Sequence, residues 1–494
     1  MKWLNKSRVG AWVGALGALA LAAQAHAQLT PFAVGDDVHA SESDAIDGAG
    51  PAPASIGPDV IVGDLNGVTR WGTDTANTMT IFSVGTTSCN IGTLPLDWVA
   101  SNNRHPVIGQ NLYRYKVVNG AARFEQIGQS WLKHGFTALA QSLCSPCQNP
   151  GTGSRLGVGC SDPYSAGLNG DQTRLGPKNH VNAATGHYPY PFTNPGAGYV
   201  TPPPAAATIG RRLQVLNTEI DPALNAGAAY YVEGQYVTWD EPQWGTNHNN
   251  CAYRRVTNAR NAQNQLTLTV SGPTVREKPA IYAWRDVHDS GVEIQEQIIR
   301  GDGQFVFAYR VTDLGNSRWH YEYAMFNNTS HQSGASFSVP ICRGANITNV
   351  GFTDVAYHSG EPYDSVDWVP EVTSTSVTWR VAETFAQNPN ANALRWGTQY
   401  NFRFIADRPP GGSASQITLG LFRPGAVSQA LFSGLSPSGC CPSDFDGNGQ
   451  VDFFDYLGFA NAFGNDEPEA DFNNSGQVDF FDYLDFASAF GAGC

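Results

Sequence analysis

Two acidic loops near the C-terminus carry the residue types that bind a hard metal ion. The first runs DFDGNGQVDFFD from Asp444 to Asp455, and the second runs DFNNSGQVDFFD from Asp471 to Asp482. In each loop, side chains with oxygen atoms stand at positions 1, 3, 5, 9 and 12, and a glycine stands at position 6. This is the ligand order of an EF-hand calcium loop, in which position 7 adds its backbone carbonyl and the glycine allows a sharp turn.

The predicted ligands are oxygen donors only, which favours calcium over zinc because no Cys or His occupies a ligand position. Four carboxylates line the first loop and three line the second, so we predict two Ca²⁺ ions, the first bound more tightly. Both loops carry Asp at position 12, where Glu is more usual. The predicted metal ligands are Asp444, Asp446, Asn448, Gln450, Asp452 and Asp455 in the first loop, and Asp471, Asn473, Ser475, Gln477, Asp479 and Asp482 in the second.

Each loop runs into a segment with the apolar spacing of an amphipathic helix. The apolar positions are Phe453, Phe454, Leu457, Ala460 and Phe463 after the first loop, and Phe480, Phe481, Leu484, Ala487 and Phe490 after the second. We predict two helices that pack face to face, with at least one Phe of each adjacent pair in the core. Because so small a unit buries little apolar surface, calcium and a disulfide from Cys494 to Cys440 or Cys441 are the expected staples.

The duplicated loop-helix repeats, the Asp at position 12 and the C-terminal location resemble a type I dockerin. The ending GAGC and the cysteines at both ends are similar to the short dockerin-type tails of secreted bacterial proteins. This resemblance covers about 55 of the 494 residues. It implies binding to a cohesin-like module or another surface or scaffold protein. Dockerins usually carry small polar or variable residues at positions 10 and 11, which choose the partner, whereas Phe453-Phe454 and Phe480-Phe481 stand there in this chain. The aromatic pairs are compatible with core positions or with an apolar docking face.

The first 27 residues have the pattern of a secretory signal peptide. Lys2, Lys6 and Arg8 precede an apolar stretch from Val9 to Ala23, and a small-x-small cleavage site ends at position 27. We therefore expect a secreted protein that is extracellular or associated with the cell surface. No later stretch approaches 18 apolar residues, so we expect no transmembrane segment in the mature chain.

Cysteine count and charge narrow the class of protein further. In an oxidising compartment the nine cysteines are expected to form disulfides, and the odd number leaves at least one unpaired within the chain. Residues 440–494 hold 11 acidic residues and no Lys or Arg, whereas the whole chain has a formal net charge of −14. An acidic tail on a nearly neutral body excludes nucleic acid as the expected partner and points to a cation.

The body of the chain is predicted to be mainly β. The run LYRYKVV-NG-AARFEQI, residues 112–127, predicts a hairpin because Asn and Gly tolerate the positive φ of a type I′ turn. Eight further short runs are β-branched or aromatic: YYVEGQYVTW, LTLTV, GVEIQEQII, QFVFAYRV, WHYEYAMF, SVTWRV, YNFRFIA and QITLGLF. We expect a flexible lead-in (28–58), a loop-rich, Gly- and Cys-rich β domain (59–206), a β-sandwich-like domain (207–435) and a small helical calcium-loop domain (440–494).

Two places in the body have residue types that are used in chemistry. Cys144-Ser-Pro-Cys147 is expected to be structural, although a redox dithiol and a zinc site with Cys160 and His134 are alternatives. Asp240-Glu241 lies between two tryptophans, which is compatible with a sugar site, but neighbours on a strand point to opposite faces and packing is the favoured interpretation.

The sequence contains no recognisable catalytic signature, so catalytic residues stay unassigned. The favoured function is a secreted calcium-binding protein whose dockerin-like tail anchors a β-rich body to a scaffold or cell surface. The alternatives are an extracellular polysaccharide-degrading hydrolase, of the glycoside hydrolase kind, and a carbohydrate-binding protein, either one carried by a dockerin. Polysaccharide is therefore a possible second partner.

Overall fold

The computed structural model describes residues 56–172, 175–190, 209–358, 361–438, 442–446, 450–473 and 475–493. The predicted signal peptide, nearly all of the predicted lead-in, the predicted ligand Asn448 and the cysteines Cys440, Cys441 and Cys494 lie outside these ranges. Over the described residues the fold is mainly β, as predicted, and its strands pair in antiparallel ladders.

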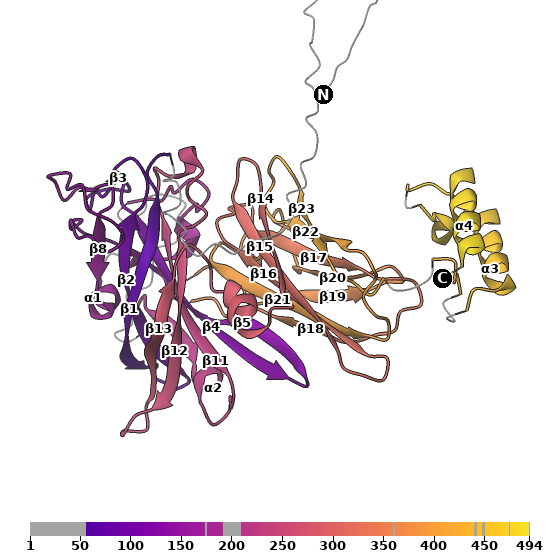
Figure 1. Ribbon diagram of the computed structural model, residues 1–494, viewed down its shortest axis with the longest axis horizontal. Coiled ribbons are helices and arrows are strands. Elements are labelled where there is room, and N and C mark those ends of the chain that lie inside the picture. Colours follow the sequence, from indigo (N-terminus) through magenta and orange to yellow (C-terminus); the bar gives the residue numbers. More distant parts are fainter. Residues whose placement is uncertain are drawn as a thin grey trace, which may run out of the picture. The chain divides into compact units, whose positions relative to one another are not determined.

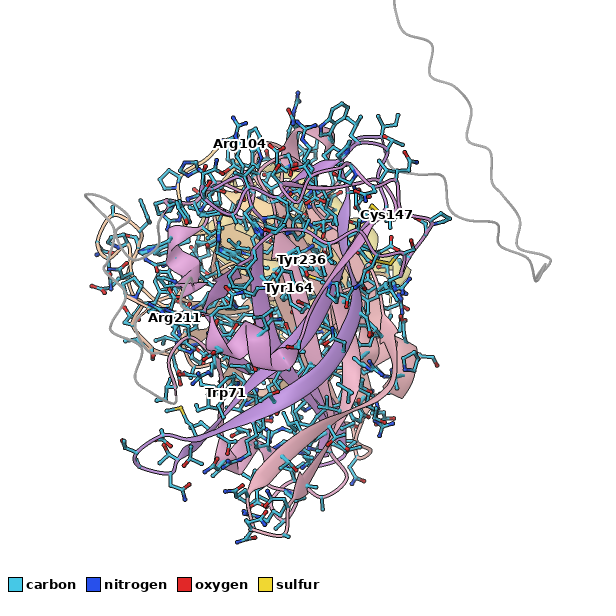
Figure 2. All side chains as sticks on the ribbon, turned by 90° about the vertical axis from the view of Figure 1, so that its left-hand side faces the viewer. Trp71, Arg104, Cys147, Tyr164, Arg211 and Tyr236 are labelled. Atoms are coloured by element: carbon cyan, nitrogen blue, oxygen red, sulfur yellow. A yellow bond between two sulfur atoms is a disulfide. The ribbon has the colours of Figure 1, made fainter. Side chains whose placement is uncertain are left out.

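The first β part is an eleven-stranded sheet with the main path β1-β2-β10-β5-β4-β11-β12-β13 (Figure 1). The sheet curls, so that β1 packs against β11, β12 and β13. The Leu65 amide of β1 donates to Thr274 Oγ1 of β13 at 3.1 Å. Tyr164 and Tyr236 lie in the interior of this part (Figure 2).

The strands of the main path are β1 (Val60–Thr73), β2 (Met79–Asn90), β4 (Val107–Val118), β5 (Ala121–Gln129), β10 (Leu213–Leu216), β11 (Ala229–Val237), β12 (Cys251–Arg260) and β13 (Leu266–Val275). Short strands are added at the side: β6 (Leu132–His134), β8 (Ser161–Tyr164) and β9 (Leu175–Gly176), with a separate pair of β3 (Leu96–Asp97) and β7 (Arg155–Leu156). The short helices are α1 (Ala166–Asp171), α2 (Asn217–Ile220), η1 (Lys178–His180) and η2 (Pro242–Trp244).

The second β part is a sandwich of two five-stranded sheets, β14-β15-β16-β21-β18 and β19-β20-β17-β22-β23. Its core is rich in aromatic side chains from both sheets, for example Phe337 of β17 stacked on Phe402 of β21 with ring centroids 4.3 Å apart. Such pairs are favourable beyond the area that they bury. The elements are η3 (Trp284–His288), β14 (Glu293–Ile298), β15 (Gln304–Asp313), β16 (Trp319–Asn327), β17 (Gly334–Pro340), β18 (Ile347–Thr353), β19 (Val369–Val372), β20 (Ser376–Arg380), β21 (Thr398–Ala406), β22 (Ser415–Leu421) and β23 (Gln429–Gly434).

The local strand predictions are confirmed. β4 and β5 form the predicted hairpin, and its two turn residues, Asn119 and Gly120, have φ values of 52° and 87°. Positive φ at both central positions is the property of a type I′ turn. The eight further runs coincide with β11, β13, β14, β15, β16, β20, β21 and β22.

The strand pairing divides the body at a different place from the boundary expected between residues 206 and 207. β11 pairs with β4 from Ala229 opposite Tyr115 to Val237 opposite Val107, and β10 lies between β2 and β5. The first sheet therefore includes strands as far as Val275, and the sandwich begins with β14. A stretch rich in Pro and Gly interrupts regular structure, but it does not decide whether the strands on its two sides share a sheet.

The cysteine pair of the C-x-x-C motif is structural, as expected, but the two cysteines are not bonded to each other. Cys89 is bonded to Cys144, and Cys147 is bonded to Cys160. The redox-dithiol and zinc alternatives are therefore wrong, because none of these sulfurs is free to bind a metal. Cys251 is a buried free thiol, which agrees with the expectation of at least one unpaired cysteine.

Candidate metal centre

The two acidic loops end where helices α3 (Phe453–Gly464) and α4 (Phe480–Ala492) begin. Asp452 caps α3 by accepting from the Phe454 amide at 2.8 Å, and its own amide donates to Asp455 Oδ2 at 2.8 Å. Asp479 and Asp482 repeat this capping box at the start of α4. A capping box satisfies amides that have no partner within the helix. Helix initiation therefore fixes the carboxylates at loop positions 9 and 12.

The carboxylate at position 12 also reaches back across each loop. Asp455 Oδ1 accepts from the Asp446 amide at 3.0 Å, and Asp482 Oδ1 accepts from the Asn473 amide at the same distance. Both side chains are fully buried. Burial acts to raise the pKa of Asp482, but the backbone amides of Asn473 and Asp479 outweigh it and lower that pKa. Asp482 is therefore held in place as a carboxylate.

In the first loop, three carboxylates converge. Oxygen atoms of Asp444, Asp446 and Asp455 lie within 4.8 Å of one another, and this is the one such acidic cluster among the described residues. Residues 440–494 contain no Lys or Arg to offset the charge. Two like charges about 4 Å apart repel by about 4 kcal/mol at an effective dielectric constant of about 20. A divalent cation with oxygen ligands removes this repulsion, so the donor set fits calcium.

The second loop has the turn geometry of the motif. Asp471 at position 1 accepts from the amides of Ser475 and Gly476 at 2.9 and 2.8 Å. Gly476 has a φ of 85°, which is a left-handed conformation that favours glycine at position 6. Asn473 Oδ1 also accepts from the Ser475 amide at 2.9 Å. With fewer carboxylates than the first loop, this loop has less charge to offer a cation.

The fully buried core of the tail comes from residues that the amphipathic pattern did not single out, and Phe463 and Phe490, which it did, pack against that core half-buried. Phe459 of α3 stacks on Phe486 of α4 with ring centroids 3.9 Å apart, and both are completely buried. The hydroxyl groups of Tyr456 and Tyr483 lie 3.0 Å apart. Each pair joins equivalent positions of the two repeats, so the repeats pack as matched halves. The 27-residue spacing of these aromatic residues is the sequence signal that identifies them.

The prediction that at least one Phe of each adjacent pair lies in the core is wrong. Phe453, Phe454, Phe480 and Phe481 are 67, 66, 64 and 65 % exposed, and the Leu side chain that follows each pair is exposed too. The reason is geometric: at 3.6 residues per turn, the buried Phe459 lies about 120° around α3 from Phe453 and about 140° from Phe454. The adjacent Phe residues therefore lie on a different face of each helix.

Asp240 and Glu241 are held by structural contacts rather than exposed for chemistry. Glu241 is fully buried and accepts from the Val60 amide, Thr238 Oγ1 and Asn250 Nδ2. Burial raises its pKa well above the usual range. These contacts favour the packing interpretation over a sugar site.

The surroundings of Asp240 and Trp239 give the same picture. Asp240 Oδ2 accepts from the Asp97 amide at 2.9 Å. Trp239 is covered by the guanidinium group of Arg104, which lies 4.5 Å from the ring centroid and is labelled at the upper end of the first β part (Figure 2). A ring covered in this way offers less apolar surface to a sugar.

A cleft of about 370 Å³ lies between the two β parts. Two of its glutamates, Glu125 and Glu219, are ion-paired with Arg114 at 2.6 Å each. Two aspartates, Asp354 and Asp367, also line the cleft. Burial raises the pKa of Asp354 to about 6, and the charge of Asp367 adds to this shift. No sequence pattern marks these aspartates, since isolated Asp residues are common in loops.

No family model matches the chain, and no curated protein was found to match it. Among the helices of the described residues, none has the length and apolar character needed to cross a membrane.

Proposed function

We propose that the C-terminal tail is a calcium-dependent docking module that attaches the β-rich body of a secreted protein to a scaffold or a cell surface. The observation that carries this proposal is the exposure of four phenylalanines on a unit that already has its own aromatic core. Exposed apolar surface on this scale is typical of an interaction site.

Calcium would act by setting the shape of this surface. Asp455 and Asp482 each belong both to a loop and to the first turn of a helix, and the exposed Phe pairs precede them directly. An ion bound by oxygens at positions 1, 3 and 12 would fix the entry of each helix and hold the Phe pair in one orientation. The expected partner is a protein with an apolar groove, such as a cohesin-like module.

The test uses the full chain and measures calcium and docking separately. Calorimetric titration with CaCl₂ should give two ions per chain. A labelled chain should bind the envelope fraction of the producing cells, or a purified cohesin-like module, in CaCl₂ but not in EDTA. The double substitution Phe453→Ala with Phe480→Ala should remove docking and leave calcium binding intact. A chain that takes up no calcium at millimolar concentration, or that docks equally well in EDTA, would refute the proposal.

A second candidate function, hydrolysis of a polysaccharide, has a narrower basis. The cleft that holds Asp354 and Asp367 offers one carboxyl group with a raised pKa beside an acidic neighbour, which is the combination that a general acid and its partner need. A screen of polysaccharides with the wild-type chain and with Asp354→Asn tests it. Hydrolysis that is unchanged in the variant, or absent from the wild type, eliminates this candidate.

A further inference from the structure

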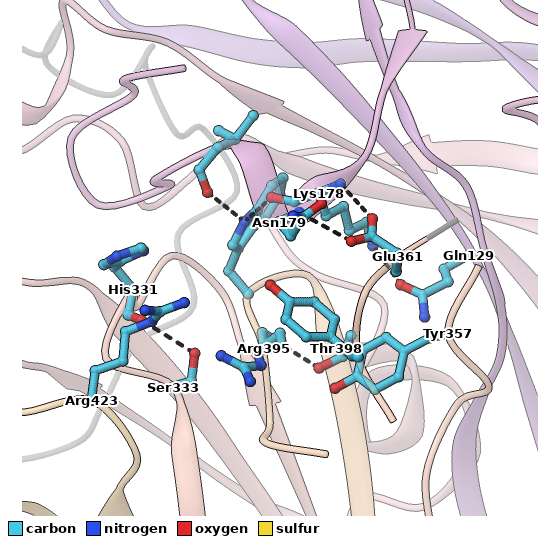
Figure 3. A pocket seen from close by; sticks show the side chains of 13 residues that line it. Gln129, Lys178, Asn179, His331, Ser333, Tyr357, Glu361, Arg395, Thr398 and Arg423 are labelled. Atoms are coloured by element: carbon cyan, nitrogen blue, oxygen red, sulfur yellow. Dashed lines mark hydrogen bonds between the residues drawn. The ribbon is translucent and has the colours of Figure 1, made fainter. Parts of the chain in front are cut away.

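A second pocket lies between the two β parts and is lined mainly by cationic and aromatic side chains (Figure 3). Its interior has a volume of about 20 Å³, which is room for only one small group, and the space around its open mouth brings the total to about 390 Å³. Lys178 of η1 enters it from the first β part, and Arg395 and Arg423 enter it from the second. In Figure 3 the two guanidinium groups lie on the opposite side of the pocket from Lys178 and Glu361.

Arg395 is buried without full use of its hydrogen-bond donors. Its side chain lies between the rings of Tyr363 and Phe422, whose centroids are 4.2 and 4.7 Å from Cζ. Nη2 donates to two backbone carbonyls, but Nε and Nη1 have no hydrogen-bond partner among the described residues, although Arg395 is only 4 % exposed. A buried donor left without a partner costs about 1–3 kcal/mol, and more in a charged group.

Arg423 has the same deficit on the neighbouring wall. Its Nε is buried and has no hydrogen-bond partner among the described residues. Burial and the charge of Arg395 both lower the pKa of Arg423, which shows that the two guanidinium groups repel each other. His331 stands beside them, and burial together with the two arginine charges lowers its pKa to about 4. The histidine is therefore neutral at pH 7 and adds no positive charge.

Lys178 adds a third cation whose direct partners are all neutral. Its ammonium group donates to Asn111 Oδ1, Gln129 Oε1 and the Gly397 carbonyl at 3.0–3.2 Å. These three acceptors satisfy the donors of the ammonium group, but they do not neutralise its charge.

Three carboxylates are near enough to offset this charge. Glu233 is fully buried and acts through its charge on Lys178. Glu361 lines the pocket and accepts from the amides of Lys178 and Asn179 at 2.5 and 3.2 Å. Asp302 lies behind the wall and accepts from Ser330 and from the His331 amide. The three cations are balanced when all three acids are ionised, but burial raises the pKa of Glu361 to about 7, so positive charge is in excess whenever this acid is protonated. Buried charge without a counterion is unfavourable by several kcal/mol.

We propose that this pocket binds one small monovalent anion between the guanidinium groups of Arg395 and Arg423. The free Nε and Nη1 groups supply the donors, the two guanidinium groups supply the positive charge, and the narrow interior excludes large ligands. The shared chemistry is that of a weakly hydrated halide such as chloride or of a carboxylate group. Guanidinium groups bind both, and they bind carboxylates in a bidentate manner.

Bromide is the probe that locates the anion. Crystals of the full chain soaked in sodium bromide should show an anomalous peak within hydrogen-bond distance of both arginines. In solution, bromide replacing fluoride at constant ionic strength should raise the unfolding midpoint. Arg423→Gln should weaken the apparent bromide affinity at least tenfold, and Arg380→Gln, which removes an exposed arginine of β20, should leave it unchanged. Arg423 is the residue to change because Arg395 also supports local packing.

Sodium acetate distinguishes the two sources of the anion. Acetate that displaces bromide supports a carboxylate as the natural ligand, and bromide binding that resists acetate supports a free halide. The proposal is overturned if bromide gives no peak between the two arginines, or if wild type and Arg423→Gln respond equally to bromide and to acetate.

Discussion

At the scale of single residues, the carboxylates at loop position 12 serve two structural purposes. The Asp455 carboxylate accepts two amide hydrogen bonds, one that starts α3 and one that closes the loop at Asp446. Its oxygen atoms also lie with those of Asp444 and Asp446. The sequence could predict this convergence because EF-hand ligands are local in sequence. By contrast, Lys178, Arg395 and Arg423 are far apart along the chain, and no pattern could bring them together.

Asp455→Asn should abolish calcium binding by the first loop. The amide side chain keeps the shape of the carboxylate but loses its charge, and the measured stoichiometry should fall from two ions to one. Calorimetric titration of the full chain checks this. Asp485→Asn removes the same charge from an exposed position of α4 outside both loops, and it should still bind two ions. An unchanged stoichiometry in Asp455→Asn would contradict the ligand assignment.

Asp240 gives a pH-dependent prediction for stability. Burial raises its pKa to about 6 in the folded chain, whereas the unfolded value is about 3.9. The folded state therefore holds this proton more tightly, and the stability it contributes is present below about pH 4 and is lost as pH rises through about 6. The free energy of unfolding of Asp240→Asn minus that of wild type should therefore rise by about 1–3 kcal/mol from pH 4 to pH 7.

Urea unfolding at the two pH values measures this difference for Asp240→Asn. The control is Asp286→Asn, because Lys278 and Arg285 overcome the effect of burial and lower the pKa of Asp286. Its pH dependence should have the opposite sign, since an acid with a lowered folded pKa contributes stability that is lost as pH falls. The same difference at both pH values for Asp240→Asn would show that its pKa is not raised.

At the scale of elements, periodicity located the helices of the tail but misplaced their buried face. FFDYLGFANAF has apolar side chains all around a helix, so more than one set of residues spaced three and four apart fits the pattern. The pairing of Phe459 with Phe486 decides between the faces, and it is a contact between repeats that the pattern of one repeat does not contain. Strand runs were easier to predict because they are short and rich in β-branched and aromatic residues, and most are separated by stretches that contain Gly, Pro or Asn.

The two faces predict different costs for one and the same substitution. Phe486→Ala should destabilise the tail by about 3–5 kcal/mol, because it removes a fully buried ring. Phe480→Ala should change stability by about 0.5 kcal/mol or less, because that ring is mostly exposed. Thermal melts of the full chain by circular dichroism at 222 nm, with limited proteolysis of residues 442–493, measure both. Equal losses in the two variants would place the Phe pair in the core after all.

At the scale of the whole molecule, the order of strands in the first sheet is the feature that the sequence leaves undetermined. β11 and β13 are predicted as strands, but the place of β11 beside β4 rests on contacts between residues more than 100 positions apart. Local pattern describes which face of a strand is apolar, and many pairings satisfy it. The clefts formed where the two β parts meet were for that reason outside the reach of sequence analysis.

The metal cluster and the described disulfides lie in different parts of the chain, and this predicts how the whole chain responds to chelation. Among the described residues the three-carboxylate cluster belongs to the tail, and the described disulfides at Cys89–Cys144 and Cys147–Cys160 belong to the first β part. Ligand binding to the folded state stabilises by about 2.7 kcal/mol per site at a concentration 100 times Kd. Removing two ions should therefore lower the free energy of unfolding of the tail by more than its small core can offset. A change of about 1 kcal/mol in that free energy moves the unfolding midpoint of a small domain by about 4–8 °C.

Differential scanning calorimetry of the full chain should then show a transition that falls by roughly 10 °C or more in EDTA. The transitions of the body should stay where they are, because calcium contributes nothing to its aromatic and disulfide-linked interior. Dithiothreitol is the matched treatment. It should lower the temperature of a body transition, because the loss of each of the two described disulfides reduces the free energy of unfolding by about 2–5 kcal/mol. If EDTA lowers every transition together, the body itself depends on calcium and the assignment of the metal to the tail alone fails.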